Sequence, residues 1–116
     1  MENTSFNNEI EYSDAKIKTE VILETSFSKE IRILLKKGQI MRDHKAPYPI
    51  IIHLLEGNID FGIEGDINRL SKGAILTLEG NVAHNLFAHE DSIVRLTLSK
   101  KDKAERVEGV AQKSPK

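Results

Sequence analysis

The most informative absence in this chain is cysteine, which does not occur among its 116 residues. Without cysteine the protein has no disulfide bonds, no thiolate metal ligands and no cysteine nucleophile. With 39% hydrophobic side chains, a chain of this length can build one compact core without such cross-links. We therefore expect a single domain.

A strong excess of charge is also missing, because 17 basic side chains are balanced by 18 acidic ones. No basic stripe interleaved with aromatic residues occurs, so we expect no nucleic-acid partner. No stretch approaches the roughly 20 apolar residues of a membrane span. Residues 1–11 contain neither a positively charged region nor an apolar run, so no secretory signal is predicted. We expect a soluble, cytoplasmic protein without membrane contact.

Several catalytic motifs are absent as well. The sequence contains no Gly-x-Ser-x-Gly elbow, no glycine-rich phosphate-binding loop and no His-Glu-x-x-His pair. Enzyme classes that depend on these motifs are therefore disfavoured.

The two ends of the chain differ in composition from its middle. Residues 1–14 hold four acidic and no basic side chains, which predicts an acidic arm that is either mobile or loosely docked. Residues 100–116 are rich in lysine and predict a basic tail. Ser99 and Asp102 could cap a short helix there, but a helix without an apolar face would be marginal. We therefore place the folded domain at residues 15–99 and expect both short ends to be solvated.

Between the ends, short apolar clusters alternate with glycines, a punctuation typical of strands and turns. We predict nine strands, at residues 17–24, 30–36, 39–45, 49–55, 58–63, 67–70, 74–78, 84–88 and 92–98. Ile59, Phe61 and Ile63 alternate with smaller or polar residues, as in a half-buried strand. Residues 50–55 are apolar on both faces, so we expect another element or another subunit to cover the back of that strand.

Two glycine-histidine spacings carry a resemblance to a known family. Gly38 is followed after five residues by His44, and Gly73 precedes His84 by eleven positions. The stretches 38–57 and 73–88 resemble the two sequence motifs of the cupin family. The resemblance implies a small, all-β, RmlC-like cupin: a double-stranded β-helix or jelly-roll barrel, commonly a homodimer, with a pocket inside.

The resemblance also implies a divalent metal held by three histidines and one glutamate. Position by position, His44 and His84 match two of these ligands, whereas Ala46 replaces a histidine and Ile50 replaces the glutamate. Two neutral imidazoles leave the charge of a dication unbalanced. Zinc, nickel, manganese or iron could bind if water, substrate or an acid completed the shell, and a metal-free pocket is the alternative.

Glu79 and Asp43 are the acids nearest to the two motifs and are the candidates to complete such a shell. Asp43 is adjacent to His44 on a predicted strand and should point to the opposite face. His53 is out of phase with Ile50, so we expect it at a sheet or subunit interface rather than among the ligands. His89 lies in a polar hairpin connection and should be exposed.

We predict a ligand pocket formed by Arg42, His44, Ile50, Ile52 and His84. His44 and His84 would face each other across it, and the two isoleucines would make its wall apolar. Arg42, in step with His44 on a regular strand, would supply a cation for a carboxylate or phosphate.

These residues predict a free-standing cupin that binds a small organic ligand. One alternative is an enzyme, either a metal-dependent dioxygenase or isomerase or a metal-free epimerase that uses a histidine and an acid. Another is a structural or partner-binding domain with a filled barrel. The few residues after Ser99 leave no room for a DNA-reading helix pair, so we do not expect a DNA-binding regulator.

Overall fold

The computed structural model describes residues 1–102 and 104–113 of the chain. These residues contain nine strands and one helix: β1 (Lys18–Glu24), β2 (Ser28–Leu35), β3 (Ile40–His44), β4 (Ile50–Glu56), β5 (Asn58–Ile63), β6 (Asp66–Ser71), β7 (Ile75–Leu78), β8 (His84–Ala88), β9 (Ser92–Ser99) and α1 (Ala104–Lys113). All nine predicted strands are confirmed, and their ends differ from the predicted ends by at most two residues.

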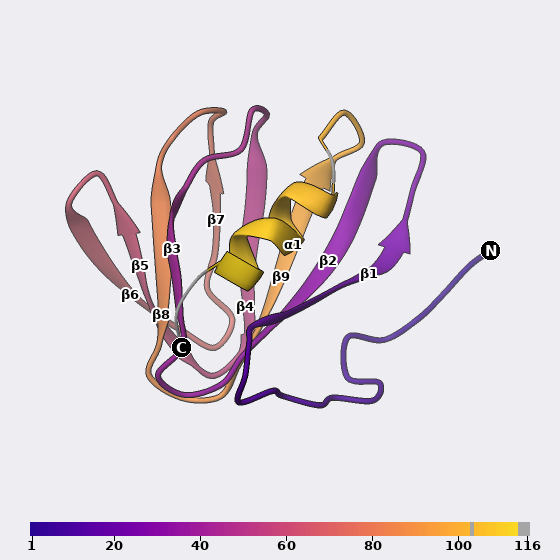
Figure 1. Ribbon diagram of the computed structural model, residues 1–116. Helices are drawn as coiled ribbons and strands as arrows, with labels where there is room; N and C mark the ends of the chain where they lie inside the picture. The colour runs from indigo at the N-terminus through magenta and orange to yellow at the C-terminus, as the bar shows by residue number, and fades with distance from the viewer. Residues whose placement is uncertain (103, 114–116) are drawn as a thin grey trace.

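The strands form two antiparallel sheets that enclose the core (Figure 1). The five-stranded sheet has the order β1-β2-β9-β4-β7, and the four-stranded sheet has the order β3-β8-β5-β6. Strands that lie side by side, such as β2 and β9, are far apart in sequence. Strands that follow each other in sequence, such as β2 and β3, often belong to different sheets. The predicted all-β barrel architecture is confirmed.

Alternation along the strands determines which side chains enter the core. On β4, Ile50, Ile52 and Leu54 are buried between the sheets, whereas Ile51 on the other face is 39% exposed. In the described part of the chain, no element buries Ile51, so the expected cover of this face is not found within one protomer. Its cover by a second subunit stays a prediction.

The N-terminal arm, residues 1–14, docks on the chain's own barrel, which is one of the two alternatives predicted for it, although most of its residues are exposed. The buried guanidinium of Arg32 on β2 donates hydrogen bonds to the carbonyl oxygens of Phe6 and Asn8, at 3.0 and 2.6 Å. The guanidinium carbon of Arg95 lies 5.6 Å from the centroid of the Phe6 ring. Acidic composition suggested a solvated arm, but the contacts depend on its backbone carbonyls and one aromatic ring.

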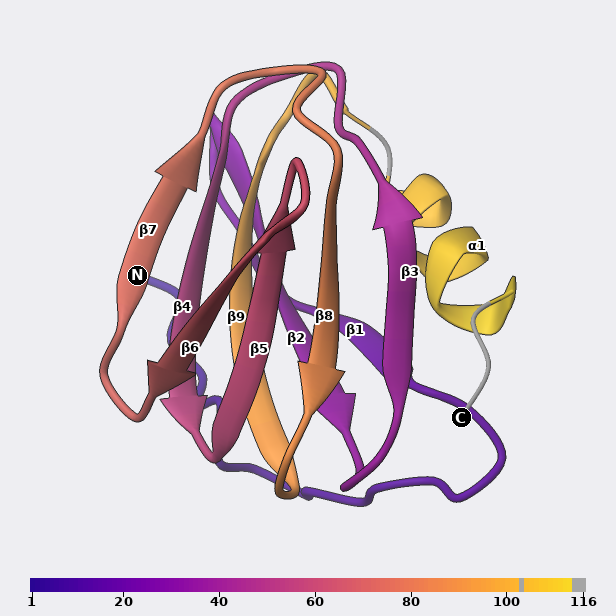
Figure 2. The same ribbon diagram turned by 90° about the vertical axis from the view of Figure 1, so that its left-hand side faces the viewer.

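The C-terminal segment also differs from the expected solvated tail, because helix α1 packs on the barrel. Val107 and Ala111 are buried and Val110 is partly buried, so the helix has the apolar face that it was expected to lack. Helix α1 contacts β1 and β3, which are edge strands of the two sheets. Figure 2 shows α1 beside β3, at the side of the barrel between these edges. Among the described residues, no helix is long and apolar enough to cross a membrane.

Candidate functional site

The site predicted from the two histidines is a small cavity inside the barrel. Its volume is about 10 Å³, which is the space that a single water molecule needs. Two of its lining residues lie outside the strands: Ala46 in the β3–β4 connection and Val107 on α1. The other eight lie on strands of both sheets and are Ile33, Met41, His44, Ile50, Ile52, His84, Leu86 and Leu96.

His44 and His84 meet in this cavity because β3 and β8 are antiparallel neighbours in which the two histidines pair directly. The centroids of their rings are 4.3 Å apart, and the ring planes cross at 60°. On the neighbouring strand β5, the buried ring of Phe61 stacks on His84 at 5.5 Å with an interplanar angle of 18°. The three rings therefore restrict one another's orientation.

Each histidine is also held by its own backbone. His44 Nδ1 lies 2.7 Å from the carbonyl oxygen of Arg42, and His84 Nδ1 lies 2.9 Å from that of Val82. A carbonyl oxygen only accepts hydrogen bonds, so each Nδ1 carries the donated proton. In a neutral imidazole, the acceptor lone pair is then on Nε2. The pair can therefore accept a hydrogen bond or coordinate a cation through Nε2.

Arg42, predicted to lie in the pocket, is placed outside it. The pairing of β3 with β8 shifts register between Met41 and His44, and this irregularity interrupts the inward-outward alternation of β3. Met41 is buried and His44 lines the cavity, while Arg42 and Asp43 between them are both exposed. Arg42 instead borders an open hollow on the outer face of the four-stranded sheet, beside Asn85.

The other predicted pocket residues come together. Ile50 and Ile52 line the cavity with the two histidines, and Ala46 lies there too. All four positions that the cupin resemblance assigns to metal ligands, namely His44, Ala46, Ile50 and His84, thus border one cavity. Two of the four carry side chains without a donor atom.

The donor set does not fit the four-ligand metal centre that the resemblance implies. Asp43 Oδ1 accepts a hydrogen bond of 2.6 Å from Asn85 Nδ2 on the outer face of the sheet, and Glu79 is exposed. Neither acid lines the cavity. Among the described residues, no group of three or more histidine, cysteine, aspartate or glutamate side chains is arranged to hold a metal ion.

The remaining two histidines lie away from the cavity. His53 is half-buried on the outward face of β4, where it pairs across the sheet with Ile75 and Arg95. His89 is less exposed than predicted: its Nε2 lies 2.8 Å from Asp60 Oδ2, and its side chain is 30% exposed. Both contribute to the outer surface of the barrel.

Apart from Ala46, the predicted pocket does not include five of the lining residues, and Val107 on α1 is the one of these that lies outside the strands; the others are Ile33, Met41, Leu86 and Leu96. The signal was present, because Val107, Val110 and Ala111 follow the i, i+3, i+4 spacing of a helical apolar face. The many lysines of the segment obscured that spacing. Met41, Leu86 and Leu96, by contrast, follow from the inward phase of their strands.

Comparisons with known proteins rest on structure alone. No family model matches the chain, and no curated protein matches it. Among solved structures, an RmlC-like cupin from Desulfovibrio desulfuricans is similar, with a TM-score of 0.77 and 22% sequence identity over 85% of this chain and 96% of that chain. The chain has the RmlC-like cupin fold. The predicted double-stranded β-helix is confirmed with it.

Two further structures show the same cupin fold. KdgF from a Halomonas species has a TM-score of 0.74 and 22% identity, over 90% of this chain and 99% of that chain. An RmlC-like cupin from Shewanella frigidimarina has a TM-score of 0.74 and 20% identity, over 92% and 96% of the two chains. The cupin fold hosts many functions, so the function must be argued from the site.

Proposed function

We propose that this cupin binds a small, mostly apolar organic molecule at the barrel cavity that contains His44 and His84. The supporting observation is the combination of two oriented imidazoles with eight apolar lining residues. Small-molecule sites typically combine an apolar wall with a few polar groups that fix the ligand's orientation.

The histidine tautomers define the polar part of this ligand. Because each Nδ1 donates to a backbone carbonyl, each neutral ring offers an acceptor at Nε2. A ligand with a hydroxyl or N–H group would satisfy such an acceptor. A purely apolar ligand of the same shape could not donate this hydrogen bond, and we expect it to bind about five to ten times more weakly.

The enzyme alternatives receive less support from the cavity. Among the described residues, no aspartate or glutamate lines it, so a metal-free epimerase would find no acid in that set. The same described residues offer no third protein ligand for a metal-dependent reaction.

A filled, purely structural barrel is the second candidate, and a specific observation favours it. The cavity volume of about 10 Å³ is far below the space that any organic ligand requires. Ligand binding therefore requires a side chain of the wall to move away.

We suggest an NMR titration of the full chain with phenol, toluene and benzoate, which share a ring but differ in polar group. We expect phenol to shift the methyl resonances of Ile50 and Leu86 saturably, and to bind more tightly than toluene. In a double variant with His44→Leu and His84→Leu, the preference for phenol should vanish while toluene still binds. If none of the three compounds shifts the cavity methyl resonances saturably, the proposed function is wrong.

A further inference from the structure

We propose that helix α1 is a movable plug of the barrel cavity, so that docking of α1 and binding of a ligand exclude each other. This inference deepens the proposed function, and its ligand-binding part rests on that function. The helix itself can be tested without a ligand.

The first argument is the position of Val107. Among the described residues that line the cavity, it alone comes from outside the β-barrel and its connections. Its side chain is 3% exposed and borders the same space as both histidines. Moving a strand residue would break the sheets, whereas moving α1 breaks none of their hydrogen bonds. The helix is therefore the part of the wall that can be displaced most readily.

The second argument is the low intrinsic stability of α1. The helix has ten residues, a length that is marginal in isolation. Gly109 interrupts its interior, where glycine is among the least favourable residues. The described residues of its apolar face are Val107, Val110 and Ala111. A short helix with an interior glycine is expected to open more readily than the whole barrel.

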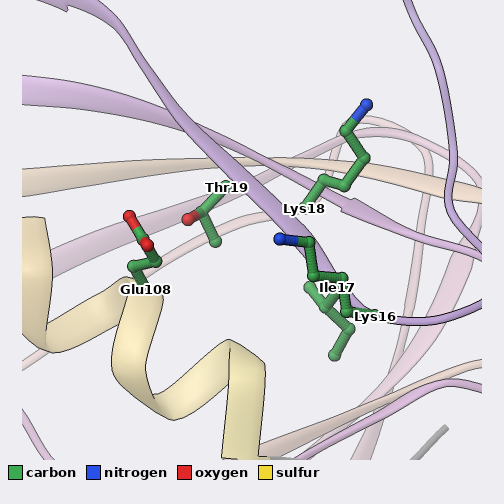
Figure 3. Close-up of a pocket in the computed structure, with 5 residues that line it drawn as sticks. All are labelled: Lys16, Ile17, Lys18, Thr19 and Glu108. Carbon is green, nitrogen blue, oxygen red and sulfur yellow. The ribbon is translucent and has the colours of Figure 1, made fainter.

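A groove along β1 borders the helix at Glu108. It has a volume of about 200 Å³ and is lined by Lys16, Ile17, Lys18, Thr19 and Glu108. Figure 3 shows Glu108 on α1 and Thr19 on β1 on the two sides of this groove. A second hollow of about 50 Å³ lies between Glu108 and Val21 further along the strand. The described contact between helix and sheet is therefore open on both sides of Thr19, where Glu108 faces β1.

Gly109 offers a matched pair of substitutions that leaves the cavity wall unchanged. Outside the helix's own backbone, a Cβ atom added there meets no atom of the described residues within 4 Å, so Gly109→Ala introduces no clash with them. It should favour the helical, docked state about five-fold through helix propensity. Gly109→Pro should favour the undocked state by about thirty-fold or more, because proline disrupts a helix interior.

Because the sequence contains no cysteine, the undocking of α1 can be measured with single introduced thiols. Ala46→Cys places a thiol in the cavity wall, and Ala88→Cys places one in the core away from the cavity. We would follow alkylation of each by iodoacetamide with mass spectrometry, in the full chain. If α1 opens alone, the thiol at position 46 should react at least a hundred-fold faster than the one at position 88. Its rate should also depend only weakly on urea, because undocking one helix exposes little surface.

The substitutions at Gly109 complete the test. Alkylation at position 46 should slow about five-fold with Gly109→Ala and accelerate about thirty-fold with Gly109→Pro. Equal rates and equal urea dependence at positions 46 and 88 would show that α1 opens only when the barrel unfolds. If the substitutions at position 109 did not change the alkylation rate at position 46, the proposal that α1 is a movable plug would also be wrong.

The affinity of these variants for phenol shows which of the two proposals is wrong, the movable helix or the ligand site. If both hold, its affinity should fall about five-fold with Gly109→Ala and rise with Gly109→Pro. Phenol binding with an affinity independent of residue 109 would support the ligand site and reject the plug. Alkylation that follows residue 109, together with no binding of phenol, toluene or benzoate, would support the plug and reject the ligand site.

Discussion

Replacing the buried carboxylate of Glu30 should remove a pH-dependent part of the protein's stability. Glu30 lies on the outer face of β2 and is 4% exposed. Its carboxylate accepts hydrogen bonds from Ser28 Oγ at 2.7 Å, Arg95 Nε at 2.9 Å and Thr97 Oγ1 at 2.6 Å. Glu30→Gln keeps the size of the side chain but removes the charge that strengthens these bonds.

The expected cost follows from the environment of the carboxylate. Hydrogen bonds to a charged group contribute about 1.5 to 3 kcal/mol each, and those to a neutral group contribute about half as much. The side chain of Arg95 is 42% exposed, so water partly replaces its lost partner. We therefore expect Glu30→Gln to lower the free energy of unfolding by about 2 to 3 kcal/mol at neutral pH.

The loss should shrink in acid. Burial raises the pKa of Glu30, but the hydrogen bonds from Thr97, Ser28 and Arg95 outweigh it, so the pKa lies below its ordinary value of 4.5. A carboxylate with a lowered pKa stabilises the fold above its unfolded-state pKa, and this contribution is lost as pH falls through the folded-state pKa. The difference between wild type and variant should therefore be full at neutral pH and should decrease below about pH 4.5.

Urea unfolding of both proteins at neutral pH and near pH 3 measures this difference. Glu24→Gln is the control, because the carboxylate of Glu24 pairs with Lys100 at the surface and should contribute less. A difference between wild type and Glu30→Gln that stays constant with pH would refute the reasoning. So would a difference at neutral pH no larger than that of the control.

Three other substitutions test the fold around the site. Gly57→Ala should lower the free energy of unfolding by at least about 2 kcal/mol in urea, because residue 57 has φ = +97° and a Cβ would collide with Ser92. Phe61→Leu should cost about 1 to 1.5 kcal/mol and broaden the imidazole resonances of His84 in NMR spectra, because the stacked ring is lost. Arg32→Met should speed proteolysis of the N-terminal arm at least several-fold, because two of the arm's hydrogen bonds disappear. An arm that stays equally resistant would contradict its docking through this side chain.

The strands could be predicted because their signals are local. Period-two alternation, as at Ile59 and Phe61, and glycines with positive φ, as at Gly38 and Gly73, reside in short stretches of sequence. The two histidines are singled out by the resemblance to the cupin motifs and not by a local signal, since the pairing of β3 with β8 that joins them is a long-range contact.

The other features depend on contacts that no short pattern records. A register shift in β3 turns Arg42 outward, although regular alternation places it beside His44. The N-terminal arm is held by Arg32, more than twenty residues away in sequence. Helix α1 gains its stability from packing against the barrel, so its short and lysine-rich sequence gave a weak signal.

The most direct test of the central claim, that the histidine pair serves an organic ligand rather than a metal, is elemental analysis of the untagged protein. The protein would be expressed with added zinc, nickel, manganese and iron, beside the His44→Ala, His84→Ala double variant. As a positive control, Ala46→His with Ile50→Glu would give the cavity the four donor side chains that a metal centre needs. We expect metal far below one ion per chain in the wild type, unchanged in the alanine variant, and near one ion per chain in the control. Near-stoichiometric metal in the wild type that disappears with the alanine variant would contradict the account.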